Sequence, residues 1–441
     1  MKFDKFFALC KEKGIEEAEI SVYNSYSLSF SLFHGEVDSY SSSESATYLA
    51  RGIYKGKLGA IVSDVYNNNL AETFVDKIIE NASVIENDDP VFIFKGSEKY
   101  RKISTFNKEL GKISADTKLN LLYDLEKKIK EADPRVIEVE SVGYEEGSTS
   151  SLILNSHGLK LSQKNNNFIY YGGAVAKEGE QVKTGFDIFF GNDFSKFNVD
   201  ELAKSIVKKA TSKLGGYQCE SSTYKAVLSQ DVVKSLLSAY VASAIAEDVQ
   251  KNSSLFVGKL NQKVASRKVT IEDKPLAKTV FARSFDDEGV ATSNMPVIKN
   301  GVLMNYFYNL TTAAKDDVQS NGHGSVGGGS KVYTSTWYLE MKPGKKSLDE
   351  LFQEIGNGVY ITEVQGLHAG LNPRSGNFSL QSTGFMVENG KVTHGLDIIT
   401  VSGNLVDLFH NITSVGSDSK EFMSGIKCPS VIVKKIKVSG K

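Results

Sequence analysis

The segment FMVENGKV, residues 385–392, decides the class of fold because residues that favour strands flank a central Asn-Gly pair. An Asn-Gly pair between two such runs is typical of a β-hairpin with a two-residue turn. The segment VIKNGVL, residues 297–303, repeats this layout across Asn300 and Gly301. Two hairpins with one signature predict that the C-terminal half of the chain is rich in β-strands.

A helix is predicted to open this C-terminal half. From about Gln230, apolar residues recur at helical spacing, and they are Val233, Leu236, Leu237, Tyr240, Val241 and Ala244. A strand is predicted before the helix at residues 224–228, and further strands after it at residues 281–284 and 332–339. The glycine pair at 215–216 ends the preceding helical segment. We therefore expect two domains, residues 1–220 and residues 221–441.

The N-terminal half alternates strands with helices. Apolar residues alternate with polar ones over residues 15–63, and Gly35, Gly52 and the turn at 55–57 are expected to divide this stretch into hairpins. A helical stripe follows over residues 70–82, and Ser114 is the expected N-cap of a second helix. Further strands are predicted at residues 136–142, 150–154, 159–161, 168–171 and 186–190. The prediction is an α+β protein with an N-terminal mixed sheet and helices, and a C-terminal β-rich domain opened by a long helix.

Composition narrows the classes of partner and compartment. The 441 residues include 52 Lys and Arg against 53 Asp and Glu, so neither nucleic acid nor an anionic membrane is an expected partner. Cys10, Cys219 and Cys428 lie far apart and form no CxxC pair, which favours a reducing compartment. No apolar run approaches the roughly 18 residues of a membrane span. We expect a cytoplasmic protein.

Two motifs invite a chemical interpretation. Residues 322–327, GHGSVG, match GxGxxG formally, but no strand is predicted before them and no helix after them, so a dinucleotide site is not indicated. A loop that lets a ligand backbone approach and a plain long hairpin loop remain open. The acidic turn, Asp286-Asp287-Glu288, could supply carboxylates for a metal or a base, but capping of its own turn is favoured.

The residues alone predict no catalytic group in this chain. The six histidines are scattered, and none is followed by glutamate, so neither HExxH nor HExxxH occurs. GxSxG is also absent, and no cysteine lies in the context of a nucleophile.

Several segments resemble the TldD/PmbA family, also called modulators of DNA gyrase. The C-terminal ones are residues 376–379, 384–390, 399–405 and 415–418; the others are residues 285–292, 300–303 and 51–59. The resemblance therefore extends over nearly the whole chain. It implies two kinds of subunit: a TldD-like zinc peptidase with HExxxH on the helix that opens the C-terminal domain, and a PmbA/TldE-like subunit that pairs with it and lacks those ligands.

This chain is similar to the second kind. Ser238, Ala239 and Ser243 stand where the resemblance places the two histidines and the glutamate. A neutral hydroxyl is a poor zinc ligand, and alanine cannot activate water. Cys428 corresponds loosely to a cysteine ligand of zinc-bearing relatives, although a packing role is favoured. The resemblance thus implies no metal or cofactor in this chain, with zinc in a TldD-like partner.

The resemblance also implies a dimer around a chamber in which small unfolded peptides are cleaved or matured. Extended peptides bind by adding a strand to a sheet edge. The candidate substrate-binding residues are Gly322, Gly324, Gly327, Gly328, His368, Gly376, Asn377 and Ser379. Ordinary tight turns are the competing interpretation of these residues. A homodimeric peptide-binding protein without hydrolytic activity, and a peptidase with an unrecognised nucleophile, are the alternative functions.

Overall fold

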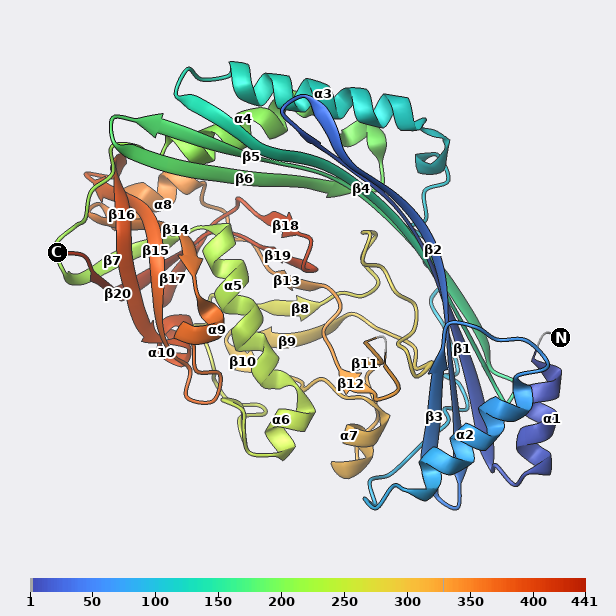
Figure 1. Ribbon diagram of the computed structural model, residues 1–441. Coiled ribbons are helices and arrows are strands. Elements are labelled where there is room, and N and C mark those ends of the chain that lie inside the picture. Colours follow the sequence, from blue (N-terminus) through green and yellow to red (C-terminus); the bar gives the residue numbers. More distant parts are fainter. Residues whose placement is uncertain (1–2, 328) are drawn as a thin grey trace.

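A computed structural model describes residues 3–327 and 329–441. Within these residues the chain forms three six-stranded sheets, a two-stranded sheet and several helices, which confirms the α+β class. Figure 1 shows the long N-terminal strands arching over the C-terminal half. No helix in this part of the chain is long and apolar enough to cross a membrane.

The N-terminal sheet is antiparallel throughout, whereas the sequence predicted a mixed sheet of parallel and antiparallel strands. In spatial order its strands are β3 (Lys57–Ser63), β2 (Glu36–Tyr54), β1 (Glu17–Phe33), β4 (Val136–Asn155), β5 (Lys160–Glu178) and β6 (Gln181–Gly191). β4 and β5 run unbroken through polar stretches that were expected to separate shorter strands. The sequence prediction failed there because neither face of these stretches is apolar.

Gly52 was predicted to mark a turn, and this prediction is wrong. It lies inside β2, opposite Ala18 of β1 and Gly59 of β3. A Cβ atom at Gly52 would come within 2.8 Å of the Ile15 side chain. The glycine is needed for the close approach of a neighbouring segment, not for a reversal of the chain.

Helices cover one face of this sheet. They are α1 (Asp4–Glu12), α2 (Ala71–Ser83), α3 (Ala115–Glu131) and α4 (Val199–Thr211), with 3-10 turns at Leu110–Lys112 and Phe194–Lys196. The Ser114 side chain accepts a hydrogen bond from the Thr117 N–H, which confirms the predicted N-cap. Side chains such as Phe30 and Ile20 are buried beneath the helices. Since side chains alternate along a strand, the opposite, concave face is left to face the C-terminal half.

The C-terminal half contains the other two six-stranded sheets. One has the order β16 (Lys391–Asn404), β15 (Asn377–Glu388), β14 (Gly358–Gln365), β7 (Ser222–Leu228), β20 (Val431–Ser439) and β17 (Ile412–Val415). The other has the order β10 (Val302–Leu303), β9 (Met295–Lys299), β8 (Ile271–Asp273), β13 (Leu339–Met341), β19 (Ile426–Cys428) and β18 (Lys420–Phe422). In the first sheet β16 also pairs with β20, which closes five strands into a ring.

The helices of this half are short. They are α5 (Gln230–Val241), α6 (Ala246–Gln250), α7 (Leu310–Lys315), α8 (Leu348–Ile355), α9 (Leu367–Gly370) and α10 (Leu405–His410), with a 3-10 turn at Ala242–Ala244. α5 is the predicted opening helix, but at 12 residues it is shorter than the long helix expected, because the chain passes into the 3-10 turn after Val241. It packs against both large sheets of this half. The two-stranded sheet pairs β11 (Gly324–Ser325) with β12 (Tyr333–Thr334).

Both predicted Asn-Gly hairpins are confirmed. Asn389 and Gly390 have φ values of 51° and 73°, and Asn300 and Gly301 have 50° and 82°. Positive φ at both central residues is the hallmark of a type I′ turn, whose twist matches that of the flanking strands. The strand predicted at residues 281–284 is wrong, because that stretch forms no strand.

The acidic turn joins separate segments of the C-terminal half to one another. Asp286 accepts hydrogen bonds from the backbone N–H groups of Glu288 (3.0 Å), Val290 (2.9 Å) and Gly324 (2.8 Å). Glu288 accepts one from the N–H of Leu310 at 2.8 Å. Asp286 thus caps its own turn, as the sequence favoured, and it also joins that turn to β11.

A buried ion pair of the sheet lies beside this turn. Arg51 of β2 and Glu19 of β1 are 2% and 1% exposed, and the Arg51 Nε donates to Glu19 at 3.2 Å. The charge of Arg51 also acts on Glu288, whose carboxyl it favours in the ionised form. Buried charges persist only where they are paired or hydrogen bonded.

Carboxylates outnumber guanidinium groups in this buried region. Glu19, Asp286, Asp287 and Glu288 stand against Arg51 and Arg283. Burial, followed by repulsion from Glu288, raises the pKa of Asp286, and burial also raises the pKa of Glu288. The folded protein therefore holds protons there that the unfolded chain releases.

The pH dependence of stability follows from these raised pKa values. Between the ordinary carboxyl pKa near 4 and the raised folded values, the folded state binds more protons, so its stability should fall as the pH rises. We expect thermal unfolding to show a lower Tm at about pH 8 than at about pH 5, with a smaller difference in Glu288→Gln. The exposed Glu44→Gln variant should follow the wild type, and an unchanged slope in Glu288→Gln would contradict the assignment.

Removal of the buried cation Arg51 should lower the free energy of unfolding more than removal of an exposed cation. Arg51→Met leaves Glu19 buried without its partner, and we expect it to lower the free energy of unfolding by about 3–5 kcal/mol. Lys13→Ala removes a cation that contacts Glu72 and Asp76 at the surface, and it should leave stability nearly unchanged. Chemical denaturation of the two variants compares them directly; equal losses would show that burial of the Arg51 pair is unimportant.

Candidate functional site

Two cavities flank the acidic turn. The larger, of about 1160 Å³, lies between residues 57–60 and 81–92 of the N-terminal half and α6, α7 and β12 of the C-terminal half. The smaller, of about 500 Å³, lies between the concave face of the sheet and residues 325–327 and 329. Glu288 lines the large cavity and Asp287 lines the smaller one. We call the second one the concave-face cavity.

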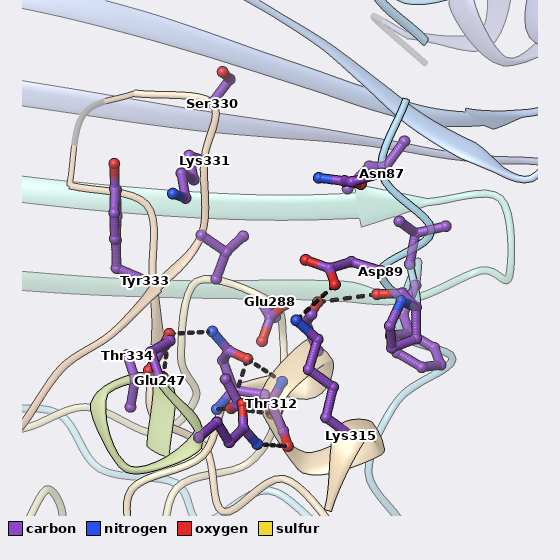
Figure 2. A pocket seen from close by; sticks show the side chains of 18 of the residues that line it. Asn87, Asp89, Glu247, Glu288, Thr312, Lys315, Ser330, Lys331, Tyr333 and Thr334 are labelled. Atoms are coloured by element: carbon purple, nitrogen blue, oxygen red, sulfur yellow. Dashed lines mark hydrogen bonds and ion pairs between the residues drawn. The ribbon is translucent and has the colours of Figure 1, made fainter. Parts of the chain in front are cut away.

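The large cavity contains two separate polar groups (Figure 2). On one side, Glu247 Oε1 accepts hydrogen bonds from Asn309 (3.0 Å) and Thr334 (2.9 Å). On the other, Lys315 forms an ion pair with Asp89 at 2.6 Å. Glu247 Oε2 is buried and has no hydrogen-bond partner among the described residues. This oxygen is free to accept a hydrogen bond from a bound molecule.

Helix capping fixes Asn309 in this cavity. The Asn309 side chain accepts from the Thr312 N–H at 2.8 Å, and the Thr312 hydroxyl lies 3.0 Å from the Asn309 N. This reciprocal capping box starts α7. Because its acceptor oxygen is used by the cap, the amide N–H₂ of Asn309 points to Glu247.

The concave-face cavity has one wall of neutral polar side chains and one wall of loops. The first wall includes Tyr23, Ser45, Thr149 and Ser151 of the sheet. The loop wall contains Arg283, which forms an ion pair with Asp287 at 2.9 Å and lies over the ring of Trp337 at 3.9 Å. Since each of these two charges neutralises the other, the cavity has no uncompensated charge on that side.

The glycines of the GHGSVG motif have different surroundings. A Cβ at Gly322 would lie 2.8 Å from the Ala291 carbonyl oxygen, and one at Gly324 would lie 2.5 Å from Glu288 Oε2. Gly324 is therefore required for packing against Glu288 of the acidic turn, and Gly322 for packing against residues 291–292, which follow the turn. Gly327, with φ of +52°, lines the concave-face cavity and has open space around it. Gly328 lies outside the described residues.

His323, between these glycines, is fully buried. Its ring nitrogens lie 2.8 Å from Asn321 Oδ1 and 2.7 Å from Asp273 Oδ2. Asp273 also accepts hydrogen bonds from the N–H groups of Trp337 and Tyr338. This histidine connects β8 to the loop of Trp337 and faces neither cavity.

The other predicted substrate-binding residues lie elsewhere, around α9. Asn377 and Ser379 line a separate hollow of about 570 Å³, which shares no residue with either cavity beside the acidic turn. Gly376 lies next to Asn404, which donates to Asn377 at 2.9 Å. His368 belongs to α9 but does not line the hollow. The structure thus divides the predicted binding residues between two places.

The positions of the degenerate zinc motif lie along α5 and its end. Ser238 is exposed and Ala239 half-buried on α5, whereas Ser243 is buried in the following 3-10 turn. Cys428 is buried, its thiol donates to the Gln230 carbonyl at 3.4 Å, and burial raises its pKa. Gln230 begins the helix, and at 1.5 Å per residue it lies roughly 12 Å from Ser238 along the axis.

The described residues contain no group of three or more His, Cys, Asp or Glu side chains arranged to hold a metal ion. The acidic turn does not form such a group because its carboxylates point to different partners. Asp286 is occupied by backbone N–H groups, and Asp287 accepts from Val326 and Arg283.

Comparison with protein families gives three consecutive matches. Residues 18–85 match PmbA/TldA metallopeptidase domain 1, residues 108–214 match the central domain, and residues 221–440 match the C-terminal domain. Among curated proteins, the metalloprotease PmbA of Escherichia coli O157:H7 is 25% identical over 332 residues, which cover 75% of this chain and 71% of that protein. A metalloprotease of Methanocaldococcus jannaschii is 25% identical over 411 residues, covering 91% and 90%.

Solved structures agree with these matches. A candidate modulator of a DNA gyrase from Thermotoga maritima superposes with a TM-score of 0.92 at 31% identity over 99% of both chains. TldE from Thermococcus kodakarensis has the same fold, with a TM-score of 0.90 at 24% identity over 99% of this chain and 100% of that one. Three family models match consecutive parts of the sequence, and a relative of 31% identity covers 99% of the chain. The chain therefore belongs to the PmbA/TldD metallopeptidase family.

Proposed function

We propose that this chain is the PmbA/TldE-like subunit of a TldD/PmbA-type metallopeptidase assembly, with the catalytic zinc in a TldD-like partner. The observation that carries the proposal is the composition of α5 and its end, where Ser238, Ala239 and Ser243 replace two imidazoles and a carboxylate. Zinc is held in proteins by imidazole, thiolate and carboxylate groups, and hydrolysis also requires a group that activates water.

The environment of these positions supports a loss of the metal site. Ser243 is buried, and its carbonyl oxygen accepts a hydrogen bond from the Ser254 hydroxyl, so the 3-10 turn is fixed by contacts of its own. Cys428 lies near the opposite end of α5, beside Gln230. The chain would therefore contribute to the assembly through its surfaces and cavities and not through a metal.

Exposed apolar side chains support contact with a partner. At the tip of the β1–β2 hairpin, Phe33, Val37 and Tyr40 are 50%, 45% and 64% exposed. Clustered apolar side chains on a surface are typical of sites where another protein binds. The expected assembly acts in the proteolysis or maturation of small unfolded peptides. A homodimer of this chain that binds peptides without cutting them is the alternative that the first test below distinguishes.

The zinc content of the purified protein should depend on the presence of the TldD-like partner. We expect mass spectrometry to find no stoichiometric zinc in the purified chain alone, and zinc together with peptide hydrolysis after co-expression with an HExxxH-bearing relative. Removal of zinc with a chelator should abolish hydrolysis by the complex. Stoichiometric zinc in the lone chain would overturn the proposal, and failure to co-purify with any such relative would favour the homodimer.

The glycine loop should matter for cleavage. Gly327→Val introduces a side chain beside the concave-face cavity, and we expect peptide cleavage by the assembly to fall about tenfold, or about 1.4 kcal/mol. Gly179→Val is the matched control, because Gly179 is also exposed, has φ of +58° and has open space, but it lies in the β5–β6 turn. Both variants bear the same backbone strain. Equal rates of peptide cleavage by assemblies with Gly327→Val and Gly179→Val would show that the glycine loop has no role in cleavage.

A further inference from the structure

A ladder of serines covers part of the concave face. Ser25, Ser27, Ser29 and Ser31 of β1 stand opposite Ser45, Ser43, Ser41 and Ser39 of β2. Three of these four pairs are joined by hydroxyl hydrogen bonds of 2.7–2.8 Å. Neutral side chains continue this face onto β4 and β5 with Thr149, Ser151, Gln163 and Asn165.

This face has the wrong composition for the core of a contact with a folded protein. Such cores are rich in aromatic residues, methionine and arginine, and serine is depleted from them. The serines at 39, 41, 43 and 45 are nevertheless exposed on a strand of a wide sheet. A surface of hydroxyl and amide groups, to which Glu145 opposite Ser29 adds a negative charge, suits a flexible polar ligand better.

The concave-face cavity adds two hydroxyl groups that the protein leaves unpaired. The Tyr23 and Ser151 hydroxyl oxygens are buried, and neither has a hydrogen-bond partner within residues 3–327 and 329–441. Both residues line the cavity. A buried polar group without a partner costs roughly 1–3 kcal/mol, so these hydroxyls favour an occupant with hydrogen-bonding atoms.

Neighbouring amides are already occupied and serve to fix the walls. Gln163 accepts from the Ser284 N–H at 3.2 Å, and Asn165 donates to the Ala282 carbonyl at 3.1 Å. The glycine-bearing loop on the other side is held by the Val326 N–H, which donates to Asp287 at 3.1 Å. The cavity is therefore bounded on both sides by groups with defined partners. Between them lie Tyr23 and Ser151, whose buried hydroxyls have no partner among the described residues.

The charge of the walls restricts the occupant. Arg283 and Asp287 neutralise each other, and the remaining polar groups that line the cavity are uncharged. An unpaired charge is expensive to bury in such a place. An elongated, neutral chain that carries many amide donors and acceptors fits both the unpaired hydroxyls and the serine ladder that extends from them.

We propose that the concave face binds the main chain of an unfolded, uncharged peptide segment, with the hydroxyls of Tyr23 and Ser151 hydrogen bonded to its amides. This inference rests on the proposed function, which supplies the substrate class of small unfolded peptides. It assigns a site that binds such peptides to the subunit without zinc. Recognition through the main chain would make the site tolerant of sequence but selective against charge.

The test is binding of a blocked octapeptide of alternating glycine and asparagine to the chain alone, measured by calorimetry. We expect Tyr23→Phe and Ser151→Ala each to weaken binding about fivefold to tenfold. Neither should destabilise the free protein, because neither hydroxyl has a partner to lose. Two glutamates at the centre of the probe should weaken binding at least as much.

Matched controls exist in the same chain. Tyr66 and Ser430 also have buried hydroxyl oxygens without partners in the described part of the chain, but they do not line the concave-face cavity. Tyr66→Phe and Ser430→Ala should therefore bind the probe as the wild type does. Wild-type affinity in Tyr23→Phe and Ser151→Ala, or no binding by the wild type, would overturn the inference.

The two proposals fail in different ways. A co-expressed complex that contains zinc and cleaves peptides, together with a lone chain that does not bind the probe, would refute only the peptide site. A lone chain that binds the probe but itself contains stoichiometric zinc would refute only the assignment as the subunit without zinc.

Discussion

The hydrogen bonds of Asp286 are the interaction on which the arrangement of the molecule depends. One carboxylate receives N–H groups from its own turn and from Gly324 of β11, and the turn lies against the buried Arg51–Glu19 pair of the arched sheet. The acidic turn, the loop that contains β11, and strands β1 and β2 of the arched sheet thus meet at one buried point. The two cavities lie on either side of this turn, since Glu288 lines one and Asp287 lines the other.

The same point explains why the neighbouring glycines cannot be replaced freely. Gly324 lets the loop approach Glu288 of the acidic turn, and Gly322 lets it approach residues 291–292, more closely than a Cβ would allow. Gly327 lies beyond these contacts and lines the cavity. A single glycine-rich motif therefore contains residues needed for packing and a residue available to a ligand. The division follows from distance to the turn and cannot be seen in the spacing of the motif.

Features set by neighbouring residues were predictable from the sequence, and features set by distant ones were not. The Asn-Gly hairpins and the Ser114 cap depend on local backbone geometry, so their residues predicted them correctly. The polar middle of β4 was not predicted as strand because its hydroxyl face meets a cavity and not a core. The sequence predicted no helix or strand over residues 86–113, yet Asp89 lines the large cavity and Tyr100 donates to the Gly289 carbonyl. Such roles come from tertiary contacts alone.

The pairing of β1 with β4 has a consequence for folding. It joins Glu19 to Asn155, so the sheet cannot be completed until a chain segment more than a hundred residues later has been synthesised. Pairings between such distant segments form slowly, and an unpaired strand edge invites association with other chains. The first matched family segment, residues 18–85, contains β1 but not β4. This segment therefore leaves one edge of β1 without its neighbouring strand, and the nascent chain exposes that edge until β4 has been synthesised.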